Sequence, residues 1–180
     1  MNTNQFTIGI VLFSLWVGVS AWCADPTEDQ EKAQKVLSNL HHANQTEIEI
    51  GRMAKEKAFS DQIRVYAERL IRDHQEADRQ VKDLARKDGI ELTPPDTSGW
   101  LDRIAAAKDQ HIKTSLSQKT GPDFDKAFTD AMIDDHKRDI ANLESAENSL
   151  NQSDVRDLIA KLLPTLQQHL DQAEQIQRSS

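Results

Sequence analysis

The chain has 180 residues, a formal net charge of −8 and 37% hydrophobic residues. That length suits one domain with a substantial core. The acidic balance, with no stripe of Lys and Arg, excludes nucleic acid as a partner. Cys23 is the only cysteine, so an intramolecular disulfide is excluded as well.

Residues 1–22 differ in composition from everything that follows them. Residues 6–22 are strongly apolar and carry no charged side chain, and small residues surround Ala21. This pattern predicts a secretory signal peptide, and the segment is short for a membrane-spanning helix. Cleavage after Ala21 fits best, and cleavage after Cys23 is an alternative. Because residues 1–5 contain no Lys or Arg, an uncleaved N-terminal anchor stays open too.

The leader implies a mature domain, residues 25–180, that is exported to the periplasm or cell envelope. Its sequence is helical in pattern throughout, with no sustained alternation typical of strands. Apolar residues that recur every three or four positions predict four long helices, at about 27–57, 60–88, 122–150 and from 153 onward. We expect no membrane span after removal of the leader.

The connections between these helices predict the topology. The first and second helices, and the third and fourth, are separated by only a few residues, so each pair forms an antiparallel hairpin. Residues 89–121 link the hairpins and contain a further helix, at about 98–117. At 1.5 Å per residue that helix is long enough to return along the bundle. The predicted fold is therefore an all-α, ferritin-like four-helix bundle with one long crossover.

Four polar residues interrupt the apolar stripes, one on each long helix: Glu47, His74, His136 and His169. Counting residues from the short turns places Glu47 and His74 within about 4 Å in depth, and the other pair is similarly level. Because buried polar groups require a partner, we expect all four to meet in the middle layer of the bundle.

Two interpretations of this layer remain open. Three imidazoles and a carboxylate that converge on one point would hold a divalent transition metal such as Zn, Cu, Mn or Fe. In that site the imidazoles bind the ion and Glu47 balances its charge. Alternatively, the imidazoles form a buried hydrogen-bond layer with Glu47, Asn44 and Thr165, and the protein is a structural or interaction module of the envelope.

Other chemistry is poorly supported. A ferritin-type di-iron centre requires Glu-x-x-His motifs, whereas the residues three before the core histidines are Ile71, Ile133 and Leu166. The chain has no Gly-x-Ser-x-Gly motif and no Gly-rich phosphate loop. We therefore assign no catalytic or cofactor-binding residue, and the sequence favours a non-enzymatic role over an enzymatic one. Protein partners are not indicated.

The sequence predicts that the remaining histidines and two aspartates lie outside the core polar layer. His41, His42 and His111 lie off the apolar stripes, so they are expected to be solvated. Asp73 and Asp135 each precede a core histidine and lie about 100° around their helix from it. A position at a helix boundary or on the surface is favoured for both, and contact with a ligand on a neighbouring helix is the alternative.

Several segments resemble the domain-of-unknown-function 4142 family of exported bacterial proteins. The likeness covers nearly the whole mature chain and rests on residues 47–54, Asp73-His74, Phe124-Asp125 with Asp135-His136, and residues 163–166 before His169. The resemblance implies a four-helix bundle of ferritin-like type and export. It implies no established activity.

Overall fold

A computed structural model describes residues 26–95 and 100–179, with side chains from residue 28 onward and excluding 100–106. Within these residues the protein is entirely helical, which confirms the predicted all-α class. The helices are α1 (Pro26–Lys57), α2 (Asp61–Lys87), α3 (Trp100–Ser117), α4 (Gly121–Ser149) and α5 (Ser153–Ser179). The predicted signal peptide and its cleavage sites lie outside the described residues.

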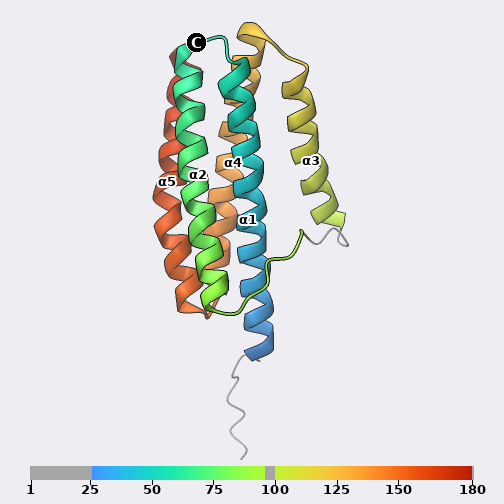
Figure 1. Ribbon diagram of the computed structural model, residues 1–180, viewed down its shortest axis with the longest axis vertical. Helices are drawn as coiled ribbons and strands as arrows, with labels where there is room; N and C mark the ends of the chain where they lie inside the picture. Colours follow the sequence, from blue (N-terminus) through green and yellow to red (C-terminus); the bar gives the residue numbers. More distant parts are fainter. Residues whose placement is uncertain (1–25, 96–99, 180) are drawn as a thin grey trace, which may run out of the picture.

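The four long helices lie side by side, and α3 lies beside them (Figure 1). The most extensive helix contacts are between α1 and α2 and between α4 and α5, as predicted for two hairpins. Contacts of α2 with α5 hold the hairpins together, whereas α1 and α4 touch much less. The connection through α3 runs along the outside, where α3 contacts α1 and α4. Whether this arrangement belongs with the ferritin-like folds stays a prediction.

Local contacts explain where the helices turn. The Ser60 side chain accepts a hydrogen bond from the backbone N–H of Ile63 and caps α2. The carboxylate of Asp125, on α4, accepts from the backbone N–H groups of Phe59 and Ser60, at 2.8 Å each. Beyond the end of α2, Gly89 has a φ of 65°, a conformation that favours glycine and stops the helix.

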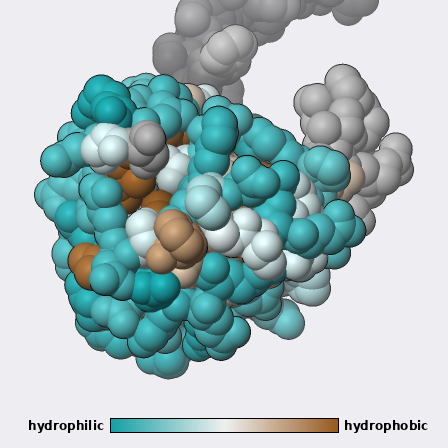
Figure 2. Space-filling model, turned by 90° about the horizontal axis from the view of Figure 1, so that it is seen from above, coloured by the Kyte–Doolittle hydropathy of each residue, from teal (hydrophilic) through white to brown (hydrophobic). Residues whose placement is uncertain are grey.

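Two apolar clusters fill the bundle, and the polar layer lies between them. One cluster, with Leu70 and Met132, is near the end where α1 meets α2. The other, with Leu37 and Val81, fills the opposite end. His74, His136 and His169 lie near the middle of their helices, between the two clusters. The surface seen from above is mainly hydrophilic, with only small apolar areas (Figure 2).

None of the described helices is long and apolar enough to cross a membrane.

Candidate metal centre

Three histidines from three different helices meet in the core. His74 on α2, His136 on α4 and His169 on α5 are 5%, 2% and 0% exposed. Their ring centroids are 5.2 to 5.8 Å apart. One ring nitrogen from each residue lies within 4.8 Å of the other two. Among the described residues, this is the group of side chains whose spacing suits a metal ion.

Each imidazole is held by an acceptor that lies outside this group. His74 Nδ1 donates to Asn44 Oδ1 at 2.9 Å. His136 Nδ1 donates to the backbone oxygen of Met132, also at 2.9 Å. His169 Nε2 donates to Asp73 Oδ2 at 2.9 Å. In a neutral imidazole only one nitrogen carries a proton, so these contacts fix which nitrogen of each ring is free.

The free nitrogens are therefore His74 Nε2, His136 Nε2 and His169 Nδ1. The Nε2 of His74 is buried and has no hydrogen-bond partner. The free nitrogens of His136 and His169 are 3.2 Å apart. In the neutral rings neither nitrogen carries a proton to share, so two lone pairs face each other. A cation placed between them, either a proton or a metal ion, would relieve that repulsion.

Burial keeps these rings neutral. The pKa of His136 is lowered to about 3, mainly by burial and in addition by the neighbouring His169. Burial also holds the pKa of His74 well below its usual range, with His136 and His169 adding to the effect. The pKa of His169 is lowered by burial, although its hydrogen bond to Asp73 opposes the shift. Neutral imidazole is the form that binds a metal.

Glu47 is buried on α1, as predicted, but it does not belong to the 4.8 Å group. Neither of its carboxylate oxygens has a hydrogen-bond partner. The pKa of Glu47 is raised to about 8, mainly by burial and in addition by the nearby charge of Asp139, while Arg138 opposes the shift. The carboxyl group is therefore mainly protonated at neutral pH.

The predicted hydrogen-bond layer is only partly present. Asn44 holds His74 as expected, but Glu47 bonds to no imidazole. The other two acceptors are the backbone of Met132 and the side chain of Asp73. Thr165 is half-buried and lines a groove beside the histidines.

Asp73 and Asp135 correct the expectation of peripheral positions. Asp73 is turned away from His74 on its own helix, but α5 packs against that side of α2, so the carboxylate faces His169. Asp135 is buried and pairs with Arg138 three residues later. Asp73 thus has a partner across a helix boundary, and that partner is one of the histidines predicted as ligands.

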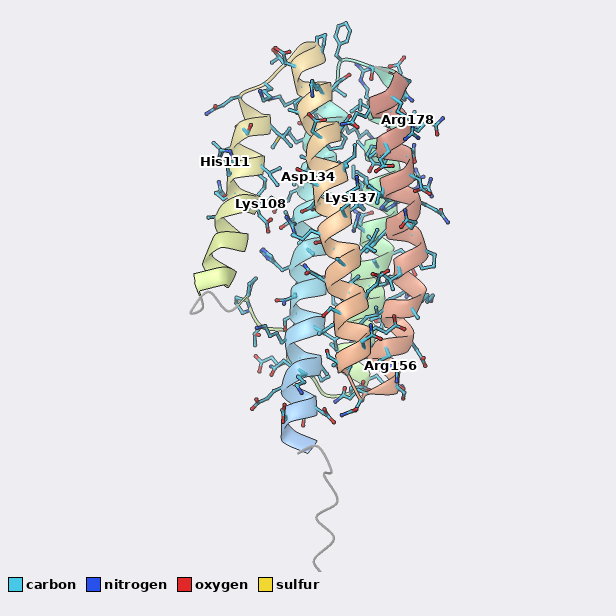
Figure 3. All side chains as sticks on the ribbon, turned by 180° about the vertical axis from the view of Figure 1, so that it is seen from behind. Lys108, His111, Asp134, Lys137, Arg156 and Arg178 are labelled. Carbon is cyan, nitrogen blue, oxygen red and sulfur yellow. The ribbon has the colours of Figure 1, made fainter. Side chains whose placement is uncertain are left out.

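The other histidines were predicted to be solvated, and His41 does not follow that prediction. It is half-buried, and its Nδ1 lies 2.5 Å from Asp78, a buried carboxylate that also accepts from Gln45. His42 and His111 are exposed. Figure 3 shows His111 on α3, outside the core of the four long helices.

Two grooves reach the histidine group from different sides. One, between α2 and α5, has a volume of about 360 Å³ and is lined by His74, His169, Asp73, Arg69 and Lys161, among others. The other, of about 330 Å³, lies between α1 and α4, and His74, Asn44 and Asp139 are among its lining residues. His74 is common to both.

Comparison with known proteins gives a family and a fold. A family model described as a domain of unknown function (DUF4142) matches residues 20–176. No curated protein matches the chain. The solved structure of CopM in the apo form is similar, with 16% identity, a TM-score of 0.63 and coverage of 82% of this chain and 96% of that one. CopM in the Cu(I)-bound form gives the same identity and TM-score, over 84% and 96% of the two chains. CopM in the Cu(II)-bound form has 17% identity and a TM-score of 0.59, over 82% and 94%.

Proposed function

We propose that this chain, which belongs to the DUF4142 family, binds one transition-metal ion through His74, His136 and His169. The observation that carries the proposal is the arrangement of the ring nitrogens. One nitrogen of each ring is engaged by an outside acceptor, which leaves one nitrogen of each ring free, and one ring nitrogen from each of the three residues lies within 4.8 Å of the other two. Metal-binding histidines characteristically have such an acceptor on the second nitrogen.

The distances support this proposal. A tetrahedral ion with metal–nitrogen bonds of 2.0–2.1 Å holds its ligand nitrogens about 3.4 Å apart. The free nitrogens of His136 and His169 already lie 3.2 Å apart, and a ring nitrogen of His74 lies within 4.8 Å of a ring nitrogen of each. The ring of His74 completes the site by moving closer to the other two. Three ligands leave a fourth position open.

Copper and zinc are the ions we propose first. Imidazole nitrogen suits both, and in the usual affinity order both exceed Mn²⁺ and Fe²⁺ at such a site. Copper has an additional argument, because CopM shares the fold and has Cu(I)-bound and Cu(II)-bound forms. Low carboxylate content makes Mn and Fe less suitable.

Glu47 is proposed as the group that balances the charge of a bound dication. Its carboxyl group is buried, and neither oxygen has a hydrogen-bond partner. A nearby dication favours the ionised form, so metal binding would release a proton from Glu47 near neutral pH. Direct ligation would require Glu47 to move toward the histidines.

The rest of the proposal concerns the setting of the site. We propose residues 1–22 as a signal peptide or retained anchor, and residues 25–180 as one ferritin-like bundle domain in the periplasm or envelope. The apolar leader and the pairing of α1 with α2 and α4 with α5 support it. The role is binding or handling of the metal, without catalysis. The rival is a structural module in which a proton, rather than a metal, lies between His136 and His169.

Metal analysis of residues 25–180, purified without a His tag, tests the proposal. Cu or Zn is added and excess ion removed before bound metal is measured, and His136→Gln is compared with His111→Gln. Because His111 is exposed on α3, its substitution removes an imidazole but leaves the core unchanged. We expect about one ion per chain in the wild type and in His111→Gln, and loss of most of it in His136→Gln.

Thermal melts of the same samples complete the test. An ion that binds only the folded state raises its stability by about 2.7 kcal/mol at a concentration 100 times its Kd. No bound metal and no shift in Tm would reject metal binding and leave the structural module. Equal loss in both histidine variants would point to binding by surface imidazoles.

A further inference from the structure

The two grooves beside the histidines differ in the charges that line them. The groove between α1 and α4 has one charged lining residue, Asp139, together with the neutral polar residues Asn39, Asn44 and Asn142. The groove between α2 and α5 is lined by the cations Arg69 and Lys161 as well as by acidic residues. Positive side chains are thus lining residues of only the α2/α5 groove.

The α1/α4 groove reaches one of the three histidines of the site. His74 lines this groove, is only 5% exposed and has its Nε2 without a partner. Asn39 and Asn142, at the outer part, are exposed. The sparse contacts between α1 and α4 explain why a groove persists here, since α1 packs mainly against α2.

Asp139, which lines this groove, belongs to a larger cluster of charged residues. Arg138 lies 3.5 Å from Asp139 and 3.9 Å from Asp109, and it also pairs with Asp135. Three carboxylates thus share this guanidinium, and Lys108 is the other cation near Asp139. The sum of these five charges is −1, which favours the approach of a cation.

The α2/α5 groove is spanned instead by Arg69. Its guanidinium donates to Asp73 on α2 and to Gln168 and Gln172 on α5. These contacts place a positive group between solvent and the side of His169 that bonds Asp73.

Building on the proposed function, we infer that the metal ion enters and leaves through the α1/α4 groove, and that Asp139 is a positioning residue that draws it in. Asp139 acts through its charge at the outer part of the groove and is not a ligand. In the α2/α5 groove, Arg69 and Asp73 instead hold His169 in place through hydrogen bonds.

Two matched alanines test the route. Ala43 lines the α1/α4 groove and Ala77 lines the α2/α5 groove, and both are half-buried on helices. Ala43→Met and Ala77→Met each add the same side chain to one groove. Cu²⁺ association with the apo protein is followed by stopped-flow absorbance, dissociation by transfer to a chelator, and affinity by titration.

We expect Ala43→Met to slow association and dissociation by the same factor, about tenfold, with unchanged affinity, because entry and exit share one path. Ala77→Met should leave both rates within about twofold. The reverse pattern, or equal effects of both variants while wild-type affinity is intact, would overturn the route alone. A wild-type protein that binds no Cu²⁺ at equilibrium would overturn the metal site and the route together.

If Ala43→Met fails to fold, Asn142→Phe is a second way to obstruct the same groove. Because Asn142 is exposed at the rim, this substitution leaves core packing unchanged, and it should also slow both the association and the dissociation of the metal ion.

Asp139→Asn should lower the association rate about three- to tenfold and reduce its dependence on salt. Glu76→Gln, in the other groove, should change neither. An unchanged association rate and salt dependence in Asp139→Asn would refute the role of that charge.

Discussion

At the scale of single residues, His169 shows how the site is prepared. Its Nε2 donates to Asp73, while its Nδ1 faces His136 at 3.2 Å. The carboxylate fixes the orientation of the ring and makes its free nitrogen a better electron donor. Arg69 holds Asp73 in turn. Asp73 therefore links a half-buried ion pair to the buried imidazoles.

Asp73→Asn should lower metal affinity by about ten- to a hundredfold, because the amide no longer offers a charged acceptor to His169. Isothermal titration with Cu or Zn measures the loss. Asp83→Asn is the control, since Asp83 lies on the same helix in ion pairs with arginines at the surface. Equal affinities of the wild type and Asp73→Asn would exclude this role.

Glu47 has a characteristic effect on the pH dependence of folding. Its pKa is about 8 in the folded protein and 4.5 in the unfolded chain, so between these values the folded state binds the additional proton. The contribution of Glu47 to the free energy of unfolding is therefore fully present at low pH. It falls by at most about 5 kcal/mol as the pH rises through this range toward 8.

Glu47→Gln should remove this loss, since the amide does not ionise. Urea unfolding of the metal-free proteins at pH 5, 7 and 9 gives the comparison. We expect the variant to gain stability relative to the wild type as pH increases. Parallel pH profiles of the two proteins would show that Glu47 ionises as freely as in the unfolded chain.

At the scale of elements, tight contacts within and between the hairpins set the alignment of the helices. A Cβ on Gly51 of α1 would lie 2.9 Å from Ile71 Cγ1 on α2, so glycine permits the close approach of these helices. Asp125 of α4 ties down the turn between α1 and α2 through two backbone N–H groups. Both residues belong to segments that carry the family resemblance, and both have a structural role here.

Asp125→Ala should destabilise the protein by about 1–2 kcal/mol, because two charge-assisted hydrogen bonds are replaced by contacts with water. The free energy of unfolding is measured with urea. Asp134→Ala, on the exposed side of the same helix (Figure 3), is the matched control and should change it by less than about 0.5 kcal/mol. A similar loss in both variants would refute the tie to the turn.

At the scale of the whole molecule, the histidine group separates two apolar clusters that would otherwise form one core. A neutral layer at this place is compatible with the fold, whereas a positive one is costly. The charge state of the middle of the bundle is therefore coupled to the stability of both ends.

The metal-free protein should lose stability as pH falls from about 6.5 toward 3. In this window the unfolded chain binds protons that His136, with a pKa of about 3, does not. From pH 6.5 to 4 this group alone contributes about 3 kcal/mol. Urea unfolding of the wild type and His136→Gln isolates the effect, because Glu47 contributes equally to both. Saturating metal should raise wild-type stability most at neutral pH, since protons compete for the ligands. An identical pH dependence in both proteins would contradict this prediction.

The sequence alone determined the helices, their turns and the inward side of each helix, because apolar periodicity and residues such as Ser60 and Gly89 act locally. It also placed three histidines at one depth. Only the tertiary structure decided which groups meet there. Asp73 faces His169 and Glu47 stays outside the histidine group because the orientation of neighbouring helices, set by packing between distant segments, decides which side chains converge.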